Sequence, residues 1–152
     1  LSLRILPVLS LSSVVIPLKE CYYLDSLGGC MASRKILAVD DSVSIRKSIS
    51  FILGQEGYEV VEAENGQDGM SKLDSDKFGL IITDINMPVM DGIQFIKEVR
   101  KSLDHKFTPI IVLTTENQES KMQEGKEAGA TGWIVKPFSS DKLIAVVKKI
   151  IG

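Results

Sequence analysis

The sequence is poor in the side chains that most catalytic and metal chemistry requires. Its 152 residues include one histidine and two cysteines, so a hydrolase that pairs serine or cysteine with histidine has little support. The cysteines, Cys21 and Cys30, are too few for a disulfide framework and have no company of metal ligands, which favours a reducing compartment. We expect the lone histidine, His105, to be an exposed loop residue.

The sequence also lacks a strong net charge and a long apolar run. A net charge of −2 offers no electrostatic argument for nucleic acid or an anionic membrane as a partner. The apolar stretch from Ile5 to Ile16 contains proline and serine and is shorter than a bilayer span, which takes about 20 residues. A chain of this length buries about two-thirds of its unfolded surface as one domain. We predict a monomeric, cytoplasmic domain.

Residues 1–32 differ in character from the rest of the chain. The sequence starts on Leu1, whereas Met31 resembles an ordinary start just before the first predicted strand. Arg4, the apolar stretch and the segment 27–30 faintly resemble a targeting signal, but prolines and charged residues interrupt the pattern. We favour an N-terminal extension at 1–32, disordered or non-native, over a signal, and we place the domain at 33–152.

Short apolar runs alternate with amphipathic segments through the domain. This alternation is typical of a parallel sheet covered by helices on both faces. Strands are predicted at 35–39, 58–62, 79–84, 110–113 and 132–135. Ser42 is expected to cap the first helix and Gly57 to end it. In the helix that begins near Ile93, we expect Leu103 to face the core.

The predicted helix at 118–128 is unlike the others. Its few apolar side chains, Met122 and Ala128, are flexible or small, and Gly125 lowers its helix propensity. Because little buried apolar surface would hold it in place, we expect this helix to move.

Acids, hydroxyls and a lysine follow four of the predicted strands at the point where each strand ends. They are Asp40 and Asp41, then Asp84, then Thr114 and Thr115, and finally Lys136, which precedes Pro137. Carboxyl ends of parallel strands meet at one edge of a sheet, so these side chains should share a site. Three carboxylates in one place repel each other, and a divalent cation with a preference for oxygen ligands would neutralise them.

This set, together with the segment 87–92, closely resembles the receiver domain of two-component response regulators. The resemblance covers residues from about 34 to 152, and Asn86, Glu116 and the segment 129–138 are most similar to single-domain chemotaxis regulators of the CheY type. It implies an α/β, flavodoxin-like (CheY-like) fold, in which a doubly wound, five-stranded parallel sheet of order 2-1-3-4-5 is flanked by five helices.

The resemblance also implies a role for each acid. Asp84 would be the phosphoacceptor, which takes a phosphoryl group from a histidine kinase. Asp41 and Asp84 would bind Mg²⁺ (or Mn²⁺) directly, together with the backbone carbonyl of Asn86, while Asp40 would act mainly through water.

Further residues receive roles in catalysis, switching and access. Lys136 and Thr114 would stabilise the phosphoryl oxygens, and Thr114 with Trp133 would form the conformational switch. Asn86, Thr115 and Glu116 would modulate access to the site. The bond between Lys136 and Pro137 is predicted to be cis.

The implied function is that of a phosphoacceptor rather than a turnover enzyme, one that catalyses its own phosphorylation and dephosphorylation. Because the sequence ends at Gly152, we expect no attached effector, and the implied partners are a chemotaxis-type sensor histidine kinase, a flagellar motor switch protein and a phosphatase. An intermediate receiver of a phosphorelay is the second choice.

Two other classes of protein fit the sequence less well. A haloacid-dehalogenase-like phosphatase needs a second acid two residues after its nucleophile, and Asn86 occupies that position. A degenerate receiver that serves only as an interaction module would not need the complete set of acids, threonine and lysine.

Overall fold

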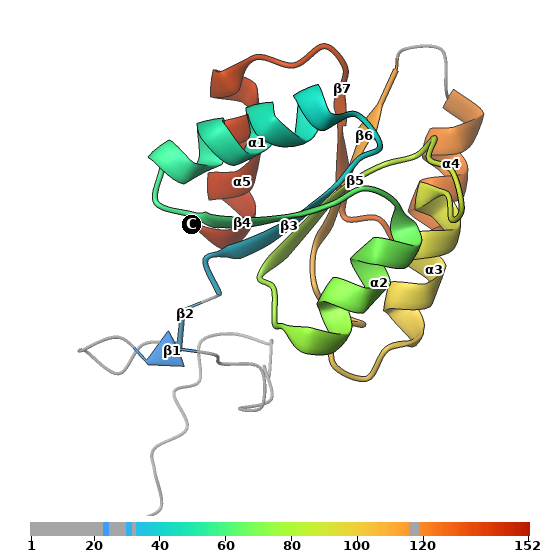
Figure 1. The fold of residues 1–152 in the computed structure, drawn as a ribbon, viewed down its shortest axis with the longest axis horizontal. Coiled ribbons are helices and arrows are strands. Elements are labelled where there is room, and N and C mark those ends of the chain that lie inside the picture. The colour runs from blue at the N-terminus through green and yellow to red at the C-terminus, as the bar shows by residue number, and fades with distance from the viewer. Residues whose placement is uncertain (1–22, 25–29, 32, 116–118) are drawn as a thin grey trace, which may run out of the picture. The chain divides into compact units, whose positions relative to one another are not determined.

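The computed structural model describes residues 23–24, 30–31, 33–115 and 119–152 (Figure 1). The chain divides into two compact units, Leu1–Met31 and Ala32–Gly152. In the first unit, Tyr23–Leu24 (β1) pairs antiparallel with Cys30–Met31 (β2). That residues 1–32 form a disordered or non-native extension stays a prediction, because most of them lie outside the described residues.

The second unit is built on five parallel strands. They are β3 (Lys35–Val39), β4 (Glu59–Ala63), β5 (Leu80–Asp84), β6 (Ile110–Thr114) and β7 (Gly132–Val135). Their order across the sheet is β4-β3-β5-β6-β7. Numbered within this sheet alone, the order is 2-1-3-4-5, so the predicted flavodoxin-like fold is confirmed. All residues of the central strand β5 are buried, as a strand covered on both faces requires.

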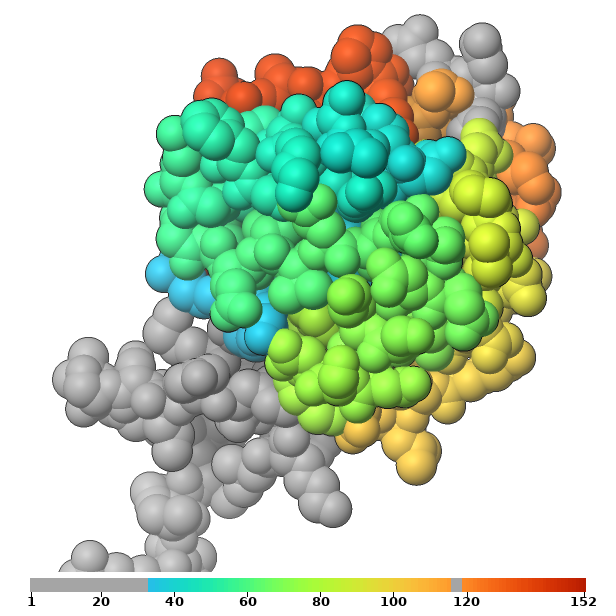
Figure 2. Space-filling model, viewed as in Figure 1, coloured from blue at the N-terminus to red at the C-terminus, as the bar shows by residue number. Residues whose placement is uncertain are grey.

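Five helices cover the two faces of the sheet (Figure 1). Helices α1 (Val43–Gln55) and α5 (Ser140–Ile151) enclose one apolar core, and α2 (Gly66–Ser75) and α3 (Gly92–Lys101) enclose the other. Helix α4 (Glu119–Ala128) lies beside α3. On the face seen in Figure 2, the edge strand β4 lies between α1 and α2. No helix in the described part of the chain is long and apolar enough to cross a membrane.

Polar caps explain where four of the helices begin. Side-chain oxygens of Ser42, Asn65, Asp91 and Ser139 accept hydrogen bonds from backbone N–H groups three residues later. Such caps satisfy donors that the first helical turn leaves without partners. The predicted cap at Ser42 is therefore confirmed, and Gly57 follows the end of α1 with a φ of 85°.

Two expectations about burial were wrong. His105 is only 3% exposed, because its loop folds back against α2 and the Nε2 atom lies 3.1 Å from the Leu73 carbonyl oxygen. Leu103 is 88% exposed, because α3 ends at Lys101 and helical spacing no longer applies beyond it.

Helix α4 carries little buried surface, as predicted. Gly125 is its one buried residue, whereas α3 buries five. The turn after α4 is held from α3, since the Arg100 guanidinium donates to the Gly129 carbonyl from Nη2 at 2.8 Å and from Nε at 3.1 Å. That α4 moves stays a prediction.

Candidate functional site

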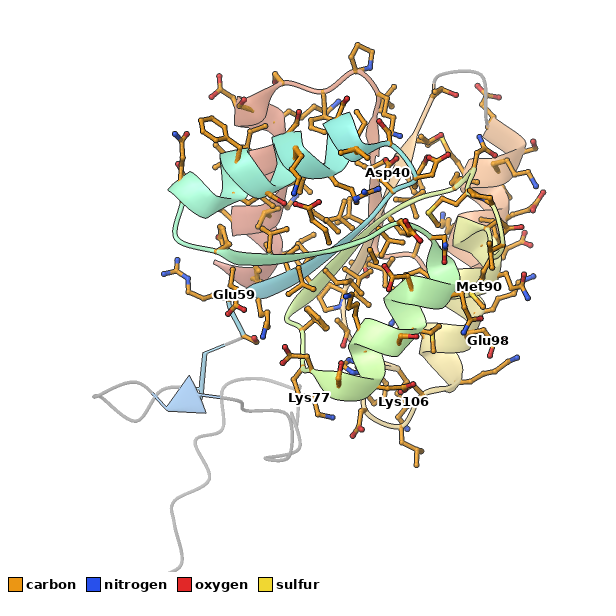
Figure 3. The ribbon with its side chains drawn as sticks, in the orientation of Figure 1. Asp40, Glu59, Lys77, Met90, Glu98 and Lys106 are labelled. Atoms are coloured by element: carbon orange, nitrogen blue, oxygen red, sulfur yellow. The ribbon has the colours of Figure 1, made fainter. Side chains whose placement is uncertain are left out.

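The three predicted aspartates meet at the carboxyl edge of the sheet. Val39 in β3 pairs with Thr83 in β5, so the residues that follow them, Asp40 and Asp84, leave the sheet side by side. One carboxylate oxygen from each of Asp40, Asp41 and Asp84 lies within 4.8 Å of the others. Figure 3 shows Asp40 at the turn between β3 and α1. The sequence-based prediction of a shared acidic site is thus matched by the geometry.

Asp40 is held on every side. Its carboxylate is buried, Oδ1 accepts from the Ser42 backbone N–H at 2.8 Å, and Oδ2 lies 3.0 Å from the Lys136 Nζ atom. Its own backbone N–H donates to the Ala63 carbonyl of β4 at 3.1 Å. Asp40 is therefore a fixed part of the site, whereas Asp41 is exposed and faces solvent.

Asp84 is nearly buried but still reachable. It is 9% exposed, and its Oδ1 accepts from the Ile85 backbone N–H at 2.8 Å. Its Oδ2 lies 3.4 Å from the Lys136 Nζ atom. Burial raises the pKa of Asp84; the Lys136 charge acts in the opposite direction, and the Asp40 charge adds to the rise. One carboxylate oxygen is thus oriented by the backbone while the other faces the ammonium group.

Lys136 joins the two buried acids. Its ammonium group lies within ion-pair distance of both Asp40 and Asp84. The backbone places it there, because the Lys136 N–H donates to the Thr114 carbonyl at 2.6 Å where β7 leaves the sheet. The predicted cis bond between Lys136 and Pro137 is confirmed.

The residues assigned to switching and access differ in their burial. Thr114 ends β6, is 1% exposed, and donates from its hydroxyl to the Thr115 carbonyl at 3.1 Å. Trp133 lies on β7 and is 38% exposed. Thr115 and Asn86 are exposed, and Glu116 lies outside the described residues.

The loop between β5 and α3 is tightly constrained, which the sequence did not predict. A Cβ atom on Gly92 would lie 2.1 Å from the Asp84 carbonyl oxygen, so only glycine fits there. Val89 has a φ of 70°, and the Met90 N–H donates to the Pro88 carbonyl across it at 2.8 Å. A β-branched residue in this region is strained.

The same loop is tied to α2. The Gly66 N–H donates to the Met90 carbonyl at 3.3 Å, and a Cβ atom on Gly66 would lie 2.8 Å from the Met90 side chain. Figure 3 shows Met90 close to the start of α2. The loop that follows Asp84 is therefore held by two contacts, one between Gly92 and the Asp84 backbone and one between Met90 and α2.

Sequence reasoning also missed Arg46. Its Nη1 donates to the Asp40 backbone carbonyl at 2.5 Å, and its Nε lies 3.4 Å from Glu62 Oε2. The available signal was weak, because a basic residue one turn into a helix is usually a solvated surface residue.

The donor set fits a hard divalent cation. It consists of carboxylate oxygens, and neither histidine nor cysteine belongs to the acidic cluster. Oxygen ligands in this number suit Mg²⁺ or Mn²⁺ rather than zinc. The carboxylate of Asp84, one member of this set, is also a suitable nucleophile for a phosphoryl group.

Comparisons with known proteins agree with this site. The profile of the response regulator receiver domain matches residues 36–148. The transcriptional regulatory protein SrrA of Staphylococcus aureus (strain NCTC 8325 / PS 47) is 40% identical over 119 residues, which are 78% of this chain and 48% of SrrA. The chain thus spans about half the length of the curated relatives that it matches.

Two solved structures illustrate the likeness. The chemotaxis protein CheY4 of Vibrio cholerae is 49% identical with a TM-score of 0.74, and the match covers 78% of this chain and 99% of CheY4. The receiver domain of the sensor histidine kinase PA1611 of Pseudomonas aeruginosa PAO1, with a magnesium ion coordinated in its active-site cleft, is 26% identical with a TM-score of 0.73, over 80% of this chain and 99% of that one. With a family match over most of its length, the chain belongs to the response regulator receiver domain family.

Proposed function

We propose that the protein accepts a phosphoryl group on Asp84 from a sensor histidine kinase, in a magnesium-dependent reaction, and signals through the resulting change of its surface. Receiver domains are signalling phosphoacceptors of two-component systems that interact with histidine kinases and bind Mg²⁺ at an acidic pocket. The observation that carries the proposal is the position of Asp84, clustered with Asp40 and Asp41 and 3.4 Å from the Lys136 ammonium.

The metal would be held by the exposed side of this cluster. Asp41 and Asp84 would bind it directly with the backbone carbonyl of Asn86, and Asp40 would act mainly through water. When bound, the cation neutralises negative charge on the transferring phosphoryl group. Asp40 is already fixed by Lys136 and the Ser42 N–H, which leaves Asp41 and Asp84 as the more accessible ligands.

The chain's own residues supply the nucleophile and a cation. A carboxylate oxygen of Asp84 attacks phosphorus, the phosphorus–nitrogen bond of the kinase phosphohistidine breaks, and its electron pair stays on the imidazole. Lys136, which bridges Asp40 and Asp84 before the reaction, then pairs with the phosphoryl oxygens. Burial raises the pKa of Asp84, which makes its carboxylate more basic.

Signalling would start at Thr114. A phosphoryl group adds three strong acceptor oxygens beside this residue, so its hydroxyl would turn from the Thr115 carbonyl toward Asp84. The indole of Trp133, now 38% exposed on β7, would move into the vacated space. Helix α4, with its small buried surface, would shift as well, which makes α4, β7 and α5 the output face.

Chemotaxis is the output that we propose first. CheY4 is described as a chemotaxis protein, and the match covers nearly its whole length. The partners would then be a chemotaxis-type kinase and a flagellar motor switch protein in the cytoplasm. Asn86, Thr115 and Glu116 would set the access of water and a phosphatase to the phosphoryl group, and with it the rate of dephosphorylation.

Gene regulation is a second candidate output. SrrA is described as a transcriptional regulatory protein, and the chain matches about half of it. A phosphorelay intermediate is the third. Family membership leaves no support for the haloacid-dehalogenase alternative.

The test is phosphoryl uptake by the wild type and by Asp84→Asn. We expect the wild type to gain the mass of one phosphoryl group from acetyl phosphate or a phosphorylated chemotaxis kinase only when Mg²⁺ is present, and the variant to gain none. Uptake by Asp84→Asn, or uptake by the wild type in a chelator, would contradict the proposal. Capture of a motor switch protein only with Mg²⁺ and beryllofluoride present would separate chemotaxis from the other outputs.

A further inference from the structure

Arg46 contacts the backbone of the turn that carries Asp40 and Asp41, which we call the acidic turn, and pairs with no carboxylate of the proposed metal site. Its Nη1 donates to the backbone carbonyl of Asp40 at 2.5 Å, and its side chain is 12% exposed. The proposed reaction assigns it no role. A mostly buried guanidinium that donates to the backbone of an acid restricts the orientation of that acid.

Glu62 on the edge strand β4 orients Arg46. Its Oε2 lies 3.4 Å from Arg46 Nε, while its Oε1 accepts from Ser50 Oγ at 2.8 Å and from Lys47 Nζ at 3.0 Å. Burial alone would raise the pKa of Glu62, but the hydrogen bonds from Lys47, Ser50 and Arg46 together lower it. The carboxylate therefore stays charged and keeps the guanidinium in place.

With this contact, each polar group of Asp40 has a partner. The backbone N–H donates to the Ala63 carbonyl, the carbonyl accepts from Arg46, and the two carboxylate oxygens accept from Ser42 and Lys136. Arg46 is the one side chain of this set that joins the turn to both α1 and the edge strand β4. Because Asp41 is the next residue in the chain, a shift of the Asp40 carbonyl would move Asp41 too.

We propose that Arg46, oriented by Glu62, is a positioning residue that fixes the turn carrying Asp40 and Asp41 and so sets the Mg²⁺ affinity of the site. This inference rests on the proposed metal site. It is a statement about geometry: the fork of the guanidinium reaches the Asp40 carbonyl and the Glu62 carboxylate at once, which a single ammonium group does not reproduce.

A purely electrostatic role would give the opposite result. A cation close to three carboxylates opposes the binding of a second cation, so its removal would strengthen Mg²⁺ binding. A positioning role predicts weaker binding both when the charge is kept and when it is removed. The variants Arg46→Lys and Arg46→Gln separate the two explanations.

The chain offers a matched control in Lys47. This neighbour of Arg46 also pairs with Glu62, its side chain is 70% exposed, and within the described residues that is its only ion pair. Lys47→Gln therefore removes one positive charge from the same carboxylate without touching the acidic turn. Glu62→Gln is a second probe, because it leaves Arg46 intact and removes the negative charge of its partner.

The experiment measures the Mg²⁺ dissociation constant of the full chain by calorimetry. We expect Arg46→Lys and Arg46→Gln each to weaken binding about tenfold, as loss of a group that supports metal ligands does. Glu62→Gln should weaken it by a smaller factor, and Lys47→Gln should change it less than twofold. In rates of phosphorylation by acetyl phosphate, the loss should appear as a higher Mg²⁺ requirement, with the maximal rate recovered at saturating Mg²⁺.

Three results would overturn the inference: wild-type affinity in Arg46→Lys, tighter binding in Arg46→Gln, or an equal loss in Lys47→Gln. Hydrogen exchange of the metal-free protein provides a test that does not depend on the proposed function. Arg46→Lys should speed exchange of the amides at 40–42 at least fivefold relative to Lys47→Gln, and equal exchange would refute positioning. If the wild type itself binds no Mg²⁺, the proposed function fails, while the exchange experiment still decides the role of Arg46.

Discussion

Helices α3 and α4 lie side by side on one face of the sheet, have ten residues each, and are held in opposite ways. Helix α3 buries five residues, including the fully buried Phe95, whereas α4 buries only Gly125. Burial of a large apolar side chain contributes about 1.5–3 kcal/mol. Packing therefore stabilises the position of α3, whereas α4 gains little stabilisation from its own buried side chains. We therefore expect α4, rather than α3, to move if a phosphoryl group is added to Asp84.

The segments at the ends of the two helices are also held differently. Helix α3 begins next to the site, where Gly92 packs against the Asp84 backbone, and its exit loop is anchored by the buried His105. The turn that follows helix α4 is held by Arg100 of α3. The helix that buries more residues thus also holds the end of the helix that buries fewer.

The largest effect should come from a substitution that creates a cavity between α3 and the core. Phe95→Ala removes a fully buried ring and should lower the free energy of unfolding by about 4 kcal/mol. The matched change in α4, Met122→Ala, should cost less than about 1 kcal/mol, because Met122 is only partly buried. Urea unfolding of both variants measures the difference, and equal losses would remove the contrast between the helices.

The next effect should come from the link between the helices. Arg100→Met leaves the Gly129 and Thr108 carbonyls without their donor, which should cost about 2 kcal/mol. Amides in the last turn of α4 should exchange faster, while those of α3 should not. Lys97→Met, on the exposed side of α3, is the control and should leave both unchanged. Unaltered exchange in α4 of Arg100→Met would show that packing alone holds its end.

A smaller effect, dependent on pH, should come from the exit of α3. Burial lowers the pKa of His105 below its usual 6.5, so the unfolded chain takes up a proton that the folded state resists. Stability is therefore fully present above pH 6.5 and is lost as the pH falls below it, through the lower folded-state pKa. His105 is the only histidine in the sequence. The free energy of unfolding should therefore fall less between pH 7 and pH 5 in His105→Gln than in the wild type. The difference should be smaller than the free energy that Arg100→Met costs. An unchanged slope would contradict this assignment.

The smallest effect should come from the loop that enters α3. Val89 has a φ of 70° and is 81% exposed, so it carries strain with little compensating burial. Val89→Asn should raise the free energy of unfolding by about 0.5–1 kcal/mol, because asparagine tolerates this region better. Thermal unfolding of the metal-free protein measures the gain, and Pro88→Ala at the exposed neighbour serves as a comparison. A loss of stability in Val89→Asn would show that the valine side chain makes a useful contact.

Local features of the chain were predictable because they depend on neighbouring residues. The cap at Ser42 and the turn at Gly57 follow from local hydrogen bonding and backbone freedom. The thin apolar content of α4 could be read directly from its sequence. His105 was misjudged because its burial depends on the Leu73 carbonyl, 32 residues earlier in the chain. The hydrogen bonds from Arg100 to the Gly129 carbonyl could not be predicted from the sequence for the same reason, because the two residues are 29 positions apart.

By itself, the sequence determined which residue types end each strand, and hence that acids, a threonine and a lysine would gather at one edge of a parallel sheet. The pattern of apolar residues was sufficient for that prediction, because neighbouring parallel strands run in the same direction and end at the same edge of the sheet. Only the tertiary structure decided how the cluster and its surroundings are supported: that Asp40 is buried and bound at every polar group, that Arg46 reaches its carbonyl, and that Arg100 of α3 holds the turn after α4. These contacts join segments distant in the chain, and their geometry exists only once both partners are in place.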